Sequence, residues 1–280
     1  MGASGAAFTT TIDGEGWDPL AAAPLDGATL ERGARGAGAR ADAVVPPYDE
    51  EMKQLVVDRV LEALEAKIPP LARGLLGPPE YGLIVGCDEG APTFYARTFF
   101  DKSDQPTKLD WSAFKDERAG LLVFLDRGPE PDRKMLARDA IVVAVTSASA
   151  SDDALAAWVT ALRDDGRWTD TRHAGTAAFA DHAMRTILAD KRHAAAGFLR
   201  SVRGLFAGSA GADLLRAAEA YGYVVDAAQK IGIGPFDGSV AMRFLDAGHR
   251  KAWAKQLEAI AGHERDAHAA LASARSAMVK

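Results

Sequence analysis

The stretch GPPEYGLIVGCDEG, residues 77–90, decides the fold class, because its middle has the composition of a β-strand bounded by turn-forming residues. YGLIVGC (81–87) is apolar and partly β-branched, whereas GPPE (77–80) and DEGAP (88–92) are short and rich in Gly, Pro and acidic residues. Short connections on both sides predict antiparallel pairing with the neighbouring strands. The stretch also holds the single cysteine of the chain, Cys87, which is therefore a candidate nucleophile.

Segments on both sides of this strand extend the pattern. LARGLL (71–76), TFYARTFF (93–100) and GLLVFL (120–125) are strand candidates for the same reasons. A helix is predicted over residues 49–67, where two prolines at 69–70 end it. Its apolar stripe consists of Leu55, Val56, Val60, Leu61 and Leu64. A helix packed on an antiparallel sheet is an α+β arrangement.

The second half of the chain has a different character. It is rich in alanine and has one proline after residue 131, which favours successive helices. The break IGIGPFDGS (231–239) separates the last two. The predicted helices lie near 133–147, 152–164, 170–188, 190–206, 211–231 and 248–277. The sequence thus predicts an α+β half over residues 1–130 and an all-helical half over residues 131–280.

Composition excludes several classes of function. The chain has 280 residues, 48% of them hydrophobic, and a net charge of −6, which argues against nucleic-acid binding. The longest apolar runs, such as LLVFL (121–125), are too short to span a membrane. The opening MGASGAAFTTTID lacks the basic and apolar regions of a secretory signal. A cytoplasmic protein without membrane or nucleic-acid partners is expected.

The order of these segments resembles a known family. A helix followed by RGLLGPPEYGLIVGCDEG (73–90), TFYARTFFD (93–101), an apolar strand and Ala-rich helices is similar to the papain-like proteins of the butirosin-biosynthesis-H type. These are fold relatives of C39-like cysteine peptidases. The similarity covers residues 47–128 and extends less specifically into the helical half. It implies a papain-like half and, in the family, acyl transfer from a carrier protein to an amine through a cysteine thioester.

The resemblance also implies a catalytic set that this chain lacks in part. The family places its cysteine at the start of a long helix, but no cysteine precedes Cys87. The family has a histidine at the start of a core strand, and this position falls at Glu80 or Tyr81. Asp101 matches the acid on the next strand that orients the histidine in the family. SGAAF (4–8) resembles a segment from the middle of the family pattern. This implies a degenerate member, or a nucleophile outside this chain.

Two acidic candidates and the cysteine each have a structural and a functional interpretation. Cys87 precedes Asp88 and Glu89, and negative charge raises a thiol pKa, which favours strand-end packing over nucleophilic catalysis. Glu80 and Asp101 are candidates for a paired-acid site. The structural alternative is that Glu80 pairs with a nearby arginine, Arg73 or Arg97.

Aromatic residues and histidines complete the candidates. If the half is papain-like, Tyr81, Tyr95, Phe99 and Trp111 line its cleft and bind the ligand. All six histidines lie in the helical half, and HERDAH (263–268) spaces two of them i, i+5, about 140° apart on a helix. That spacing does not suit a shared metal ion. No metal and no cofactor are expected.

The predicted function follows from these alternatives. We expect a non-catalytic, degenerate papain-like protein that binds a small molecule, a peptide or a carrier-linked acyl group in the cleft between the halves. One alternative is an active acyltransferase or amide hydrolase that uses Cys87, the Glu80 and Asp101 pair, or a nucleophile outside this chain. Another is an assembly role for the helical half, and a homo-oligomer is left open.

Overall fold

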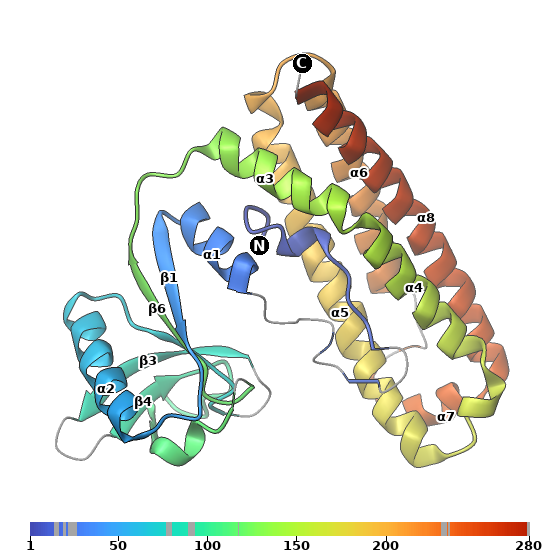
Figure 1. The fold of residues 1–280 in the computed structure, drawn as a ribbon. Helices are drawn as coiled ribbons and strands as arrows, with labels where there is room; N and C mark the ends of the chain where they lie inside the picture. The colour runs from blue at the N-terminus through green and yellow to red at the C-terminus, as the bar shows by residue number, and fades with distance from the viewer. Residues whose placement is uncertain are drawn as a thin grey trace. The chain divides into compact units, whose positions relative to one another are not determined.

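The structure is a computed structural model in which the chain forms two compact units (Figure 1). It describes residues 1–13, 17–18, 21, 27–76, 80–88, 93–116, 118–230, 234 and 236–278. The sheet unit comprises Ala34–Pro131, and the helical unit comprises Met1–Gly33 together with Asp132–Lys280. An antiparallel sheet followed by helices confirms the predicted α+β class. The predicted turns at 77–79 and 89–92 lie outside the described residues, as does most of IGIGP (231–235).

Six strands and one long helix build the sheet unit. All neighbouring strands pair antiparallel, in the order β1-β6-β2-β3-β4-β5. The strands are β1 (Ala39–Val44), β2 (Leu71–Arg73), β3 (Tyr81–Asp88), β4 (Thr93–Arg97), β5 (Thr107–Leu109) and β6 (Leu122–Arg127), and the helix is α2 (Glu50–Glu65). The four predicted strands are confirmed, although β2 and β4 are shorter than expected. Two strands are not predicted by the sequence: β1, where only the last residue is β-branched, and the three-residue β5.

The two ends of α2 follow from local chemistry. Asp49 caps the helix by accepting a hydrogen bond from the Met52 amide, which supplies a partner for one of the free N–H groups of the first turn. At the other end Lys67 adopts a left-handed φ of 58°. The amides of Lys67 and Ile68 then donate to the carbonyls of Leu64 and Ala63. These two hydrogen bonds form a Schellman motif.

One face of α2 packs on the sheet and creates the core of this unit. Val56 and Val60 are fully buried against Ile84 and Phe94, which face the helix from β3 and β4. Burial of side chains of this size contributes roughly 1.5–3 kcal/mol each. An aromatic group closes the cluster: Tyr48, Phe94, Trp111 and Phe114 make edge or tilted ring contacts with one another.

The helical unit is built from long helices. They are α3 (Arg133–Thr146), α4 (Ala148–Arg163), α5 (Thr171–Val202), α6 (Ser209–Lys230), the short α7 (Val240–Leu245) and α8 (Ala247–Met278), and α1 (Gly27–Gly36) precedes β1. The predicted end of a helix at 188 is wrong, because neither Gly nor Pro interrupts residues 176–196 and α5 continues to Val202. The predicted helix start at 152 is also late. Ser151 lies inside α4, where its hydroxyl accepts from the Thr10 amide.

The first residues of the chain belong to the helical unit, which corrects the expected boundary of the first half at residue 1. Phe8 is fully buried beside Phe198 of α5 and Tyr221 of α6. Trp17 is 1% exposed and contacts the rings of Trp168 and Phe244. These large apolar side chains lose contact with water only against the helices, so the N-terminal residues associate with that unit.

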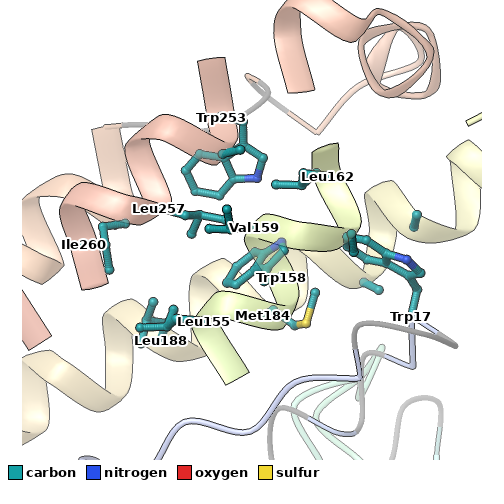
Figure 2. Close-up of a cluster of buried hydrophobic side chains, with 14 of the residues drawn as sticks. Trp17, Leu155, Trp158, Val159, Leu162, Met184, Leu188, Trp253, Leu257 and Ile260 are labelled. Atoms are coloured by element: carbon teal, nitrogen blue, oxygen red, sulfur yellow. The ribbon is translucent and has the colours of Figure 1, made fainter. Parts of the chain in front are cut away.

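Tryptophans organise one of the two cores of the helical unit (Figure 2). Trp158 of α4 and Trp253 of α8 meet edge to face, 5.7 Å between centroids. Both indole N–H groups donate to Oδ1 of Asp181, which is buried on α5.

Among the described helices none alone is long and apolar enough to cross a membrane. The bent pair α3–α4 reaches that length and apolar composition only when the two helices are taken together.

Candidate functional site

Glu80 immediately precedes strand β3, and Cys87 lies near the other end of that strand. The seven residue steps between them correspond to roughly 23 Å of extended chain. Glu80 is exposed, and its carbonyl accepts from the Gly74 amide where β3 begins. Cys87 pairs with Phe94 near the other end of β3. The two residues therefore cannot act in one site.

Cys87 faces the hydrophobic cluster of the sheet unit. Its cross-strand partner Phe94 is fully buried there, and the cysteine side chain packs against the same cluster. The sheet unit contains no histidine, so no imidazole of this unit can activate the thiol. This environment is that of a small packing residue at the end of a strand.

Asp101 organises the loop that follows β4. Its carboxylate accepts hydrogen bonds from Arg97 at 3.4 Å and from the Thr98 hydroxyl at 3.2 Å, and its side chain is 12% exposed. Arg97 also donates to the carbonyls of Ser103 and Asp104. The Glu80 carboxylate makes no ion pair in the described part of the chain, so the expected pairing with Arg73 or Arg97 is absent there, and the paired-acid site with Asp101 stays a prediction.

The four expected ligand-binding aromatics do not converge. Strand register places Tyr81 and Tyr95 on the sheet face opposite the α2 cluster. Trp111 lies on the α2 side, 4.9 Å from the ring of Phe94. Phe99 is 87% exposed in the loop after β4. These residues therefore do not line a common cleft.

The hydroxyl groups of Tyr81 and Tyr95, on the sheet face opposite α2, differ in their hydrogen bonds. The Tyr95 hydroxyl donates to Oδ2 of Asp88 at 2.9 Å, and this bond raises the pKa of Tyr95. The Tyr81 hydroxyl is buried and has no hydrogen-bond partner in the described residues. Burial raises the pKa of Tyr81, which Arg73 partly offsets. Both phenols are therefore neutral at physiological pH.

A concave site lies elsewhere in the sheet unit, between α2 and the end of β6. This α2–β6 pocket has a volume of about 460 Å³, within the usual range for small-molecule sites. Its lining combines apolar side chains with charges of both signs. The lining residues are Arg59, Glu62, Ala63, Ala66, Ile68, Phe124, Leu125, Asp126 and Arg127.

Arg59 and Phe124 form a rigid wall of the pocket. The guanidinium carbon of Arg59 lies 4.1 Å from the centroid of the Phe124 ring, in cation–π geometry. Its Nη1 also donates to Oδ2 of Asp42 on β1 at 2.6 Å. Because both the ring and the ion pair hold the guanidinium, this side chain is ordered before any ligand arrives.

The other charged side chains of the pocket are available to bind a ligand. Glu62, Asp126 and Arg127 make no ion pair or side-chain hydrogen bond with other described residues. Ile68 reaches the lining because the Schellman motif turns the chain back after α2. The pocket thus offers an ordered aromatic and guanidinium surface together with carboxylates and a second guanidinium.

The sequence does not predict this pocket. Arg59, Glu62 and Ala66 occupy successive turns of one helix face, a pattern that a solvated helix surface shows equally well. The strand end at residues 125–127 gives no separate signal. Only the packing of Arg59 on Phe124 distinguishes the site.

The structure also bears on the metal candidates. No group of three or more His, Cys, Asp or Glu side chains within the described ranges could hold a metal ion. In HERDAH, His263 contacts the ring of Tyr223, whereas His268 is buried 3.7 Å from Glu264. The two histidines thus have different neighbours on α8.

Comparison with known proteins adds no functional assignment. No protein-family model matches this sequence, and no curated protein shows significant similarity to it. The resemblance to papain-like proteins of the butirosin-biosynthesis-H type therefore stays a prediction.

Proposed function

We propose that this chain is a non-catalytic binding protein whose sheet unit holds a small molecule in the α2–β6 pocket. The observation that carries the proposal is the ordered stack of Arg59 on Phe124 beside charged side chains that have no partner in the described structure. A small molecule suits the volume of the pocket better than a folded partner does. All lining residues belong to the sheet unit, so the site needs no contribution from the helical unit.

The lining specifies the chemistry of the ligand. Arg127 provides a positive charge for a carboxylate or phosphate group of the ligand, which a guanidinium binds in bidentate fashion. Glu62 and Asp126 provide acceptors for an ammonium group. Ala63, Ile68 and Phe124 provide apolar surface. The ligand class that satisfies all three features is a zwitterion with an apolar part.

The absence of a catalytic arrangement around the cysteine supports a binding role. Cys87 packs toward the cluster, and among the described residues no hydrogen bond joins the acids Glu80 and Asp101. The catalytic alternative that uses Cys87 requires a reactive thiol. It predicts rapid alkylation of Cys87 by iodoacetamide near neutral pH, whereas we expect slow labelling that accelerates only on unfolding.

A thermal-shift screen of the full chain tests the proposal. Its arms are amino acids and dipeptides with apolar side chains, aminoglycosides, acyl-carrier proteins, and neutral analogues of the same amino acids. We expect at least one apolar zwitterion to raise the Tm in a concentration-dependent way, because ligand binding to the native state alone stabilises it. We expect the neutral analogue to have a smaller effect.

Two matched variants locate the ligand. Arg127→Gln removes the pocket guanidinium, and Arg40→Gln removes an exposed arginine from neighbouring β1 outside the lining. The Tm shift should shrink in Arg127→Gln and persist in Arg40→Gln. Equal shifts in both variants, or no stabilising zwitterion up to millimolar concentration, would reject the pocket as the binding site.

A further inference from the structure

A second concave surface lies within the helical unit, between the middle of α3 and the end of α8. Like the first pocket, this α3–α8 groove has a volume of about 460 Å³. It is lined by Arg138, Ile141, Val142, Arg275 and Met278. Charge of a single sign and apolar surface thus occur together, which differs from the mixed charges of the α2–β6 pocket.

The charge of the groove is positive, although the chain as a whole is acidic. Net charge is −6 over the whole sequence, yet the lining contains two guanidinium groups and no carboxylate. The Arg275 side chain makes no ion pair or hydrogen bond with other described residues. Arg138 makes one long hydrogen bond, 3.4 Å from its Nη2 to the Met278 carbonyl oxygen. Neither guanidinium is neutralised by an acid of the lining.

The apolar part of the groove continues along α3. Ile141 is fully buried at its base, and Val142 is 39% exposed. Met135 is 47% exposed and lies seven residues before Val142, which is about two helical turns on the same face. These two exposed side chains extend the apolar surface of the groove along α3.

We propose that the α3–α8 groove binds an anionic amphiphile, that is, a molecule with a carboxylate or phosphate head and an alkyl chain. The head pairs with Arg138 and Arg275, and the chain covers Val142 and Met135. The ligand needs negative charge because the lining offers only guanidinium groups, and it needs an apolar chain because Val142 and Met278 adjoin them. This site is separate from the proposed function, since it uses another unit and another class of ligand.

Methionine-methyl NMR of the full chain tests this assignment. The chain contains six methionines, of which Met278 lines the groove and Met135 continues it. Octanoate, octanol and octylamine share one chain length and differ in head-group charge. Titration with octanoate should shift the Met278 and Met135 methyl resonances and leave that of buried Met184 in place. Octanol should bind more weakly and octylamine more weakly still.

Substitutions then distinguish octanoate binding in the groove from nonspecific attraction of octanoate to surface arginines. Arg138→Gln and Arg275→Gln should each weaken octanoate binding, by up to about five-fold for an exposed ion pair. Arg265→Gln is the matched control, because Arg265 is an exposed arginine on α8 outside the lining. An equal loss in the control variant would overturn the proposal. So would equal affinity for octanol, or no shift of either methionine at millimolar octanoate.

A lipid surface is a second source of the same head-group chemistry. Vesicles of phosphatidylcholine with and without phosphatidylglycerol distinguish it from the free amphiphile. The proposal expects octanoate binding without co-sedimentation on either vesicle. Sedimentation only with the anionic vesicles, without an octanoate shift, would replace the small-molecule site by membrane association.

Discussion

Arg192 of α5 and Glu264 of α8 form a salt bridge in which neither side chain has any exposed surface. Nε of Arg192 lies 2.6 Å from Oε1 of Glu264, and Nη2 lies 2.9 Å from Oε2. The same guanidinium donates to the Ala7 carbonyl at 2.6 Å and to the Thr10 hydroxyl. One arginine therefore joins two long helices to the N-terminal segment.

Removing one partner of this buried pair should destabilise the protein strongly. Arg192→Met leaves the Glu264 carboxyl group buried without its partner, and also frees the Ala7 carbonyl. We expect a loss of about 3–5 kcal/mol in the free energy of unfolding, measured by urea denaturation at pH 7. The double variant Arg192→Met with Glu264→Leu should lose less than the single one, because no isolated charge remains. A double variant that is less stable than the single would contradict this account.

Asp181 should make stability fall as pH rises through the mildly acidic range. Burial raises its pKa from 3.8 to about 6, against the opposing effects of Arg185 and the two indole N–H groups. A native pKa above the unfolded one means that the native state holds the proton longer. Stability is therefore lost as pH rises from about 4 to 6, by up to about 3 kcal/mol.

Asp181→Asn isolates this contribution. The amide oxygen can still accept from Trp158 and Trp253, while the titration is removed. Urea unfolding between pH 4 and 7 should show wild type losing stability relative to the variant over that window. Asp266→Asn, an exposed position on α8, is the control. Parallel pH profiles for wild type and Asp181→Asn would show that Asp181 does not titrate in this way.

His268 should have the opposite effect on acid stability. Burial lowers its pKa below 6.5, and Arg192 adds to this, while Glu264 and Asp152 oppose it. The unfolded state then binds a proton at higher pH than the native state does. Stability present above about pH 6.5 is therefore lost as pH falls below that value.

His268→Gln should reduce this acid-dependent loss. Its control is His263→Gln, on the same helix but facing Tyr223 instead of the buried salt bridge. NMR titration of the His268 ring protons gives an independent readout. A midpoint above 6.5 would show that Glu264 and Asp152 outweigh burial and would reverse the sign of the expected pH dependence.

The sequence predicts the elements of this fold better than their assembly. Strand β3 and helix α2 are recognisable because their composition and periodicity agree with their local structure. Strand β1 is not, because alternating Ala with charged residues gives little β signal. Phe8 and Trp17 show why the assembly is not predicted. Their partners lie more than 150 residues away, and no local pattern encodes such contacts. The α2–β6 pocket depends on the same kind of distant packing.

Lys67 offers a prediction about the end of α2. It is the residue after the C-cap and adopts φ 58°, a left-handed conformation that costs a side-chain-bearing residue more than glycine. Lys67→Gly relieves the left-handed conformation but also raises the conformational entropy of the unfolded chain, which opposes the gain. We expect a net rise of about 0.5–1 kcal/mol in the free energy of unfolding. Urea denaturation at high salt, where surface charge is screened, measures the difference. Lys67→Ala removes the charge and keeps the Cβ atom, so it should give no such gain. If both variants gain equally, the effect comes from charge, and the left-handed turn that brings Ile68 into the α2–β6 pocket is unstrained.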